Sequence, residues 1–320
     1  MLPFRIAWGR GRHPAAATLG DSLFQWLSSG VALALIGLLI LIAIVLFVGA
    51  EESLRRFGVG FLSGAIWDPV PPEVFGAAPF VYGTLVTSAL ALLFGVPISL
   101  GIAIFLSELA PPWLRIPLTY LVELLAAVPS VVYGLWGIFV LAPAMRNVVE
   151  PWVQGSFGFL PIFGGTPIGT DKFTAGVILA VMIIPTISAV SREALLAVPQ
   201  SQREAALSLG ATRWETTRLA VLRYARAGIF GSIVLGLGRA VGETMAVTMT
   251  IGNRNAISVS LFDQGQTIAS WIANNFTEAG PLELSALIEL GLVLMLMSLL
   301  INIFARVMVR RVLRREELAA

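Results

Sequence analysis

The sequence predicts an all-α integral membrane protein with six transmembrane helices. Hydrophobic residues make up 57% of the 320 residues and charged residues only 12%, and the mean hydropathy is +0.86. A soluble domain carries about 25% charged residues, so this composition indicates a membrane protein. A helix needs about 20 apolar residues to cross the hydrocarbon core, and six such runs are present. The expected spans are residues 30–49, 80–107, 117–143, 173–191, 227–251 and 284–305.

The first of these spans is expected to be retained as a helix. Residues 31–49 contain no charged side chain. A cleaved signal peptide is the alternative, but its apolar region is only about 7–15 residues long. We therefore expect a cytoplasmic N-terminal tail over 1–29, a transmembrane domain over 30–310 and a cytoplasmic C-terminal tail over 311–320.

The distribution of Arg and Lys predicts the orientation of the spans. Fifteen of these residues lie in the two termini and in the connections between the second and third spans and between the fourth and fifth. Five lie in the other three connections. Because basic residues accumulate in cytoplasmic loops, both termini are expected in the cytoplasm. The outer connections, about 50–79, 144–172 and 252–283, are long and rich in Pro, Gly and aromatic residues.

Prolines fall inside three of the predicted spans, at Pro97, Pro129 and Pro185. An interior proline removes a backbone hydrogen bond, and membrane helices tolerate it where neighbours satisfy the freed groups. Kinked helices are therefore expected at these positions.

The cytoplasmic loop over 192–226 is predicted to form two short helices separated by a turn. Ser201 with Glu204, and Thr212 with Glu215, each have the spacing of a capping box, which starts a helix. Gly210 is expected to end the first helix in a left-handed conformation. The second helix would lead into the fifth span.

A DNA-binding function is one alternative for this loop. Gln202, Ala206 and Gly210 have the spacing found in helix-turn-helix units, and the loop is basic. However, spans hold both of its ends, so a recognition helix would not reach a major groove freely. We therefore expect no nucleic-acid partner.

The same loop resembles the EAA motif of ABC importer permeases. Glu204, Ala205, Ala206 and Gly210 match the motif in place, whereas its later part departs from the pattern at Ala220 and Arg223. Three further segments are similar to the PstC-type permease of phosphate-specific ABC transporters, and the similarity runs in order over roughly 55–310. These segments are residues 82–111, 123–143 and 236–253.

The resemblance implies a type I ABC importer permease fold and a defined set of partners. A PstA-type permease would pair with this chain over a dimer of PstB-type ATPase subunits, and a periplasmic phosphate-binding protein would deliver phosphate. The complex would lie in the lipid of the bacterial cytoplasmic membrane. In that family, the short helix carrying Glu204, Ala205, Ala206 and Gly210 docks on the ATPase and couples its closure to the spans.

Independent features agree that this chain is not itself an enzyme. Lys172 is the only lysine, and its surroundings do not form a phosphate-binding P-loop. No cofactor is therefore expected in this chain, and ATP and Mg would be held by the partner ATPase. The chain has no cysteine, and its single histidine, His13, lies among arginines near the N-terminus, so no metal site is expected.

The fifth span contains two charges, Arg239 and Glu243, which a helix would place one turn apart on the same face. Each costs about 2.5–3.5 kcal/mol at the centre of a lone span, so both are expected to face the interior. One hypothesis is a buried ion pair that fixes packing, with Gly238 and Gly242 allowing another helix to approach. The other is a phosphate pathway through Arg239, with Glu243 limiting how tightly the anion is held. The resemblance favours the second, because the matched residues are implicated in transport in the PstC family.

Four other polar residues are given weaker roles. Glu108 ends the second span and is expected to be solvated. Glu123, Glu289 and Asn302 are expected to form hydrogen bonds between helices or to reach the membrane surface. A permease for another oxyanion, an ion-coupled secondary carrier and a membrane-anchored sensor remain as alternative functions. The sequence shows no internal repeat for the carrier and no output domain for the sensor.

Overall fold

The computed structural model describes residues 15–317. These residues form two compact units that divide between Gly49 and Ala50. The predicted tails lie in part outside the described residues, as does His13. The first unit consists of the long helix α1 (Ala15–Gly49), whose stretch Gly20–Gly49 is long and apolar enough to cross a membrane. None of its best apolar window is buried inside this chain.

The second unit is almost entirely helical, apart from a two-stranded antiparallel sheet in which Trp67 pairs with Phe75. Four π-helical turns (η1, η2, η3 and η5) and one 3₁₀ turn (η4) interrupt or join its helices. Its elements are α2 (Glu51–Phe57), α3 (Gly60–Ser63), β1 (Trp67–Asp68), β2 (Val74–Phe75), α4 (Ala78–Ile104), η1 (Phe105–Leu109), α5 (Pro112–Ala127), α6 (Ser130–Trp136), η2 (Gly137–Leu141), α7 (Ala142–Ala144), η3 (Met145–Val149), α8 (Glu150–Phe157), η4 (Pro161–Phe163), α9 (Lys172–Leu196), α10 (Gln200–Ser208), α11 (Arg213–Thr216), η5 (Thr217–Val221), α12 (Leu222–Val241), α13 (Met245–Thr250), α14 (Ile268–Asn275) and α15 (Pro281–Glu317).

The described residues contain six helical stretches that could span a membrane, which confirms the predicted number. Three of them differ by ten residues or more from the sequence prediction. The first begins at Gly20 instead of 30, and the fifth runs over Arg213–Val241 instead of 227–251. The third runs over Ser130–Phe157 instead of 117–143, because α5 ends at Ala127 and Pro129 precedes the new helix α6. Pro97 and Pro185 lie inside continuous helices, whereas Pro129 lies at a break.

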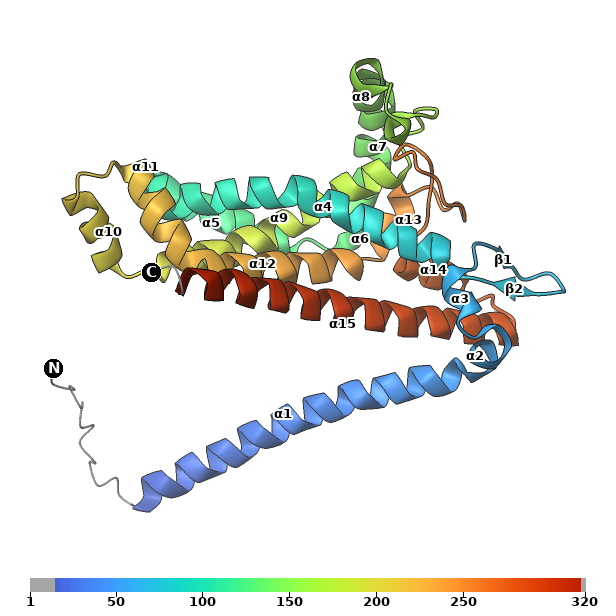
Figure 1. Cartoon of the computed structure of the whole chain (residues 1–320), viewed down its shortest axis with the longest axis horizontal. Helices are drawn as coiled ribbons and strands as arrows, with labels where there is room; N and C mark the ends of the chain where they lie inside the picture. Colours follow the sequence, from blue (N-terminus) through green and yellow to red (C-terminus); the bar gives the residue numbers. More distant parts are fainter. Residues whose placement is uncertain (1–14, 318–320) are drawn as a thin grey trace. The chain divides into compact units, whose positions relative to one another are not determined.

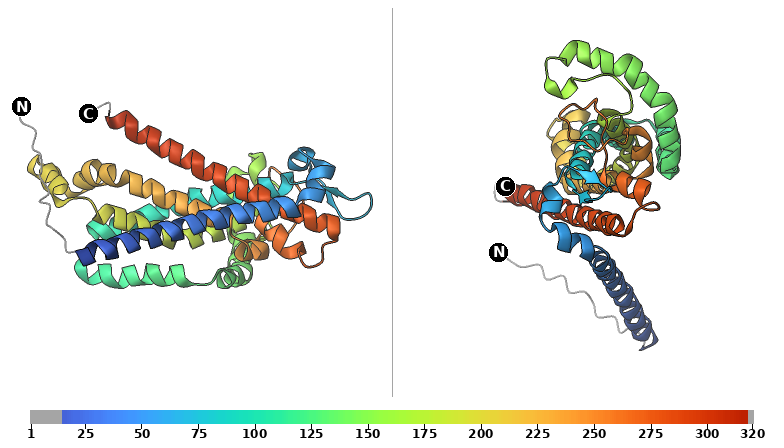
Figure 2. Two further views of the ribbon diagram at one scale, coloured as in Figure 1. Left: turned by 90° about the horizontal axis from the view of Figure 1, so that it is seen from below. Right: turned by 90° about the vertical axis from the view of Figure 1, so that its right-hand side faces the viewer.

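Helix α9 forms the centre of the second unit, with α4 and α12 packed along it (Figure 1, Figure 2). About two thirds of its most apolar window (67%) is buried, compared with 28–33% for the other spans of this unit. Ala91 from α4, Ile183 and Ile187 from α9, and Ala240 from α12 share one apolar cluster. This packing fixes the three helices relative to one another.

Glycines allow the close approach of these helices. A Cβ added at Gly176 of α9 would lie 2.5 Å from Cβ of Leu90 on α4. A Cβ at Gly228 of α12 would lie 2.4 Å from Cβ of Ala194 on α9, an atom that no side-chain rotation can move away. Interfaces between membrane helices favour small residues for this reason.

The end of the second unit that carries β1 and β2 is held by aromatic and polar contacts. Trp67 packs edge-on against Phe80 and Trp271, and its indole nitrogen donates a hydrogen bond of 2.9 Å to Glu283. The hydroxyl of Ser53 on α2 donates to Glu289 on α15 over 2.5 Å. The prediction that Glu289 forms a hydrogen bond between helices is therefore confirmed.

Helices α7 and α8 extend away from the three-helix centre, and the chain returns from them to the start of α9 (Figure 1). Asp171 begins α9 by accepting a hydrogen bond of 2.8 Å from the backbone N–H of Thr174. It is fully buried, and this desolvation raises the pKa of its carboxyl group. Lys172, which is also buried, donates to the carbonyl of Ser258 over 2.9 Å.

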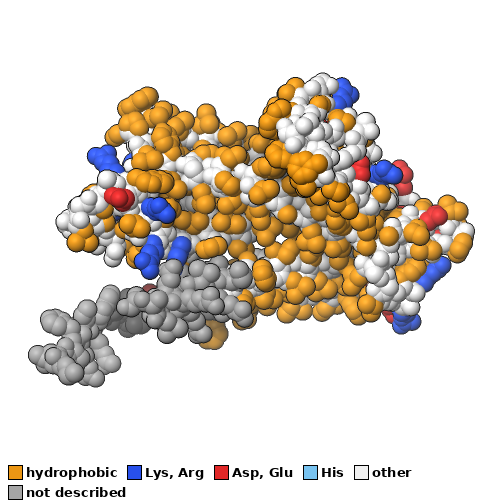
Figure 3. Space-filling view, turned by 45° about the horizontal axis from the view of Figure 1, so that its top comes forward, with side chains coloured by type: hydrophobic (Ala, Val, Ile, Leu, Met, Phe, Trp, Pro, Cys, Tyr) orange, Lys and Arg blue, Asp and Glu red, His pale blue; other side chains and the backbone are white. Residues whose placement is uncertain are grey.

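The visible face in Figure 3 has the charge distribution of a membrane protein. Apolar side chains cover its middle, and the coloured Lys, Arg, Asp and Glu side chains gather toward its ends. In Figure 1, α10 and α11 lie at one end of the second unit, and β1, β2 and α14 lie at the other.

The contact at Gly228 predicts that Gly228→Val destabilises the protein. The added side chain would overlap Ala194, and overpacking of this kind costs about 1–3 kcal/mol. Gly231→Val is the matched control, because Gly231 lies in the same helix with no atom within 4 Å of the added Cβ. Thermal unfolding in detergent should occur at a lower temperature for Gly228→Val than for Gly231→Val. Equal unfolding temperatures for the two variants would contradict this packing.

Candidate functional site

Arg239 and Glu243 lie on either side of a helix break. Helix α12 ends at Val241 with Gly242 as its C-cap, and α13 begins at Met245. The prediction that one helical face carries both charges is therefore wrong. The helix ends at Gly242, so Arg239 lies in the last turn of α12 and Glu243 lies in the connection that follows.

The guanidinium group of Arg239 is held by a neutral partner. Its Nη1 donates a hydrogen bond of 2.9 Å to the hydroxyl of Thr186, which projects from the middle of α9. Arg239 is half-buried. Among residues 20–307, whose side chains the structure describes, it forms no ion pair. Most of its N–H donors therefore remain available to another acceptor.

Glu243 caps the start of α13 instead of pairing with Arg239. Its Oε1 accepts from the backbone N–H of Ala246 over 3.4 Å, and its side chain is half-buried. A carboxylate is favourable at a helix N-terminus because the first N–H groups have no partner within the helix. The hypothesis of a buried Arg239–Glu243 ion pair is thus wrong for this structure.

Gly238 and Gly242 do not pack against another helix of this chain. Both are exposed, and a Cβ at Gly238 would have no atom within 4 Å. A Cβ at Gly242 would have only the carbonyl oxygen of Gly238 nearby, at 3.6 Å. In α12, the glycines that allow close approach of α9 are Gly228 and Gly236.

The loop between α9 and α12 folds as the predicted helix, turn and helix. Gly210 has φ +83°, and Ala211 and Gly210 donate back to the carbonyls of Ala206 and Leu207. This pattern is a Schellman motif, which confirms the predicted cap. Thr212 and Glu215 form the predicted capping box, with hydrogen bonds of 2.8 and 3.3 Å.

The first capping box was predicted incorrectly. Helix α10 begins at Gln200 with Pro199 before it, and its N-terminus has no side-chain cap. Ser201 therefore lies inside the helix and does not cap it. Proline presets a backbone angle suited to the start of a helix, and this sets the boundary two residues earlier.

The surface of α10 and the turn that follows it is open. Glu204, Ala205 and Gly210 are exposed, and Ala206 is half-buried. Leu209 is 90% exposed, and Leu207 and Trp214 are also exposed. Apolar side chains gathered on a protruding helix and turn are typical of a surface that binds another protein.

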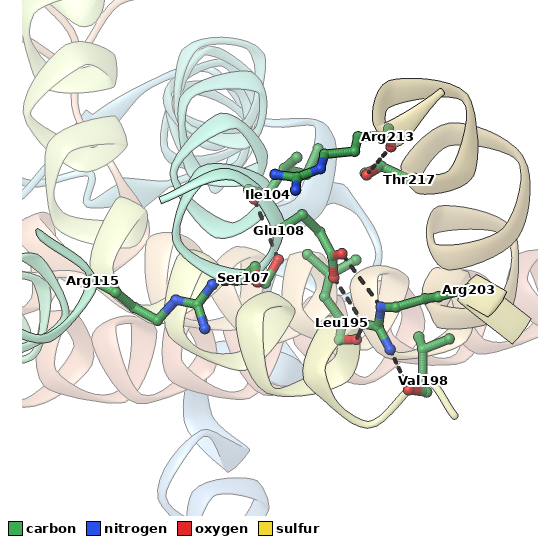
Figure 4. A network of polar contacts seen from close by, with 9 residues as sticks. All are labelled: Ile104, Ser107, Glu108, Arg115, Leu195, Val198, Arg203, Arg213 and Thr217. Atoms are coloured by element: carbon green, nitrogen blue, oxygen red, sulfur yellow. Dashed lines mark hydrogen bonds and ion pairs between the residues drawn. The ribbon is translucent and has the colours of Figure 1, made fainter. Parts of the chain in front are cut away.

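Glu108 is not solvated, contrary to the prediction. It forms an ion pair of 2.8 Å with Arg203 of α10, and its side chain is only 12% exposed (Figure 4). Sequence reasoning also missed Thr186, the hydrogen-bond partner of Arg239. The one available signal was a hydroxyl residue directly after Pro185 within an apolar span.

Comparison with known proteins places this architecture in a family. The model of the binding-protein-dependent transport system inner membrane component family matches residues 95–314. The chain belongs to this family. It is therefore a transporter subunit rather than an enzyme, and it has the type I ABC importer permease fold. Multi-pass insertion in the inner membrane agrees with the six candidate spans.

Relatives of this permease are similar over almost their whole length. The phosphate transport system permease protein PstC of Haemophilus influenzae is 46% identical over 91% of this chain and 93% of the relative. The protein of the same name from Mesorhizobium japonicum is also 46% identical, over 92% of this chain and 91% of the relative. In fold, a chain of a bacterial ABC transporter involved in alginate import matches 92% of this permease, with a TM-score of 0.61 and 17% identity.

Proposed function

We propose that this chain is the permease subunit of an ATP-driven phosphate importer and forms half of the translocation pathway. The observation that carries the proposal is the state of Arg239, a half-buried guanidinium that, within the described residues 20–307, has one neutral partner and no paired carboxylate. The names of the relatives, phosphate transport system permease proteins at 46% identity, support phosphate as the anion.

Arg239 would bind phosphate transiently. A guanidinium stays charged at all relevant pH values and presents a planar fork that matches phosphate oxygens. Thr186 fixes one Nη atom and leaves the rest of the fork open. Glu243 follows the helix break, and its negative charge would weaken the hold on an anion at Arg239. Conduction requires binding of this kind, strong enough for entry and weak enough for release.

Helix α10 would dock on a cytoplasmic ATPase subunit through Glu204, Ala205, Ala206 and Gly210. The support is the exposed surface of α10 and its apolar turn, together with the match to the EAA motif. ATP and Mg would be held by that partner, a dimer of PstB-type subunits, and this chain would need no cofactor of its own. Both termini and α10 would face the cytoplasm, as the distribution of basic residues predicts.

A second permease of PstA type would complete the pathway. The exposed backbone at Gly238 and Gly242 would allow a helix of that partner to approach beside Arg239. A periplasmic phosphate-binding protein would deliver the ion to the opposite end of the complex. A permease for another tetrahedral oxyanion is the second candidate, because an arginine fork does not by itself distinguish such ions.

The role of Arg239 predicts that Arg239→Gln leaves the complex assembled but lowers phosphate uptake. Charge-assisted hydrogen bonds contribute about 1.5–3 kcal/mol each, so a loss of about 10- to 100-fold is expected. Uptake of labelled phosphate should be measured in cells in which co-purification confirms assembly. Arg55→Gln is the control, because it removes an exposed arginine from α2. Normal uptake by an assembled Arg239→Gln complex would refute the proposal.

The left-handed cap predicts that Gly210→Val uncouples ATP hydrolysis from transport or prevents ATPase attachment. A Cβ at Gly210 would meet no atom within 4 Å, so only the backbone conformation at φ +83° opposes valine. Gly210→Asn is the matched control, because asparagine tolerates this conformation. Glu204→Gln should act in the same direction as Gly210→Val. If transport stays coupled to ATP hydrolysis in both Gly210→Val and Glu204→Gln, the proposal that α10 docks on the ATPase is refuted.

A further inference from the structure

Helix α10 packs against η5 and is also joined to α4 and α9 through a largely buried side-chain network around Arg203. No residue of α10 is buried, and only Arg203 and Ala206 are half-buried. Figure 4 shows the Arg203 side chain directed from α10 toward the ends of two other segments. The side chain is only 16% exposed.

The guanidinium of Arg203 binds three acceptors at once. Its Nη2 donates to Glu108 over 2.8 Å and to the carbonyl of Leu195 over 2.9 Å, and its Nη1 donates to the carbonyl of Val198 over 2.5 Å. A third nitrogen, Nε, lies 3.4 Å from the second oxygen of Glu108. The planar fork of arginine allows this arrangement, which a single ammonium cannot reproduce.

The three acceptors belong to the cytoplasmic ends of the two helices that form the centre of the unit. Leu195 lies in the last turn of α9, and Val198 directly follows its C-cap, Ala197; both residues are buried. A cation at the C-terminal end of a helix interacts favourably with the helix dipole. Glu108 lies in η1, the π-helical turn that continues α4.

The end of α4 is held from a second side as well. The guanidinium of Arg115 donates to the carbonyls of Ser107 and Ala110, which flank Glu108 and the end of η1, over 3.2 and 3.4 Å. Glu108 is therefore fixed in a rigid turn when it meets Arg203. A displacement of α10 would pull on α4 and α9 together.

We propose that Arg203 is a positioning residue that makes α10 a rigid extension of α4 and α9. Its contacts with Glu108, Leu195 and Val198 would pass the movement of the docked ATPase to the helix that carries Thr186. The inference rests on the proposed function, because it assumes that α10 receives the ATPase. It adds a residue outside the EAA match, identified by its contacts.

The test compares phosphate transported per ATP hydrolysed in proteoliposomes that contain the whole complex. Arg203→Gln should lower this ratio by about tenfold or more while ATP hydrolysis continues, since buried charges lose their partners. Glu108→Gln should lower it less, because the bonds to the Leu195 and Val198 carbonyls persist. The double substitution Glu108→Arg with Arg203→Glu should stay low, since it restores an ion pair but no donor to those carbonyls.

The outcomes separate this inference from the function on which it rests. A wild-type complex that hydrolyses ATP without phosphate uptake would refute the proposed function. A wild-type complex with coupled uptake and an unchanged ratio in Arg203→Gln would overturn only the role of Arg203. Where Arg203→Gln lowers assembly, Glu108→Gln decides, and an unchanged ratio in that variant overturns the inference. Arg55→Gln, which breaks an exposed ion pair in α2, serves as the control and should keep the wild-type ratio.

Discussion

The close packing of α9 against α4 and α12 is the constraint on which the rest of the second unit depends. The absence of a side chain at Gly176 makes room for Leu90, and at Gly228 for Ala194, so the three backbones approach closely. Dense packing of this kind resists small deformations and shifts as a body. Each polar feature of interest is attached to α9: Asp171 at its start, Thr186 in its middle, and Leu195 with Val198 at its end.

Helix α9 therefore contacts both the proposed anion site and the residue that connects it to the ATPase-docking helix α10. Thr186 and Leu195 are nine residues apart, which corresponds to about 14 Å along a helix. A movement of α10 that reaches α9 through Arg203 would therefore move Thr186 and, through the packed helices, Arg239 with it. Thr186 holds one Nη atom of Arg239, so the guanidinium would change its position relative to the other half of the pathway without losing this hydrogen bond.

The sequence predicted the features that depend on local composition. Apolar run length determines how many helices can cross a membrane, so the number of spans was predicted correctly. The cap at Gly210 and the box at Thr212 depend on residues within five positions of each other, and the structure confirms both. The match at Glu204–Ala206 and Gly210 likewise led to the correct family.

The features that were missed depend on contacts between distant residues or on competing local signals. Arg203 and Glu108 are 95 positions apart, and Arg239 and Thr186 are 53 apart, so helical spacing does not relate them. The fixed spacing of Arg239 and Glu243 suggested one helix, but Gly242 ends the helix between them. Composition also does not reveal the helix break before Pro129, because apolar residues continue on both sides of it.

The central claim, that α10 and α9 move as one body, is tested most directly by a distance measurement between spin labels. The chain contains no cysteine, so cysteines introduced at exposed Ser201 of α10 and exposed Val190 of α9 would be the only ones in this subunit, and the labelled subunit would be assembled with partner subunits free of reactive cysteine. Pulsed electron resonance on the assembled complex would give their separation without nucleotide and with ATP bound. The account predicts the same narrow distance distribution in both states. A distribution that shifts or broadens when ATP binds would contradict it.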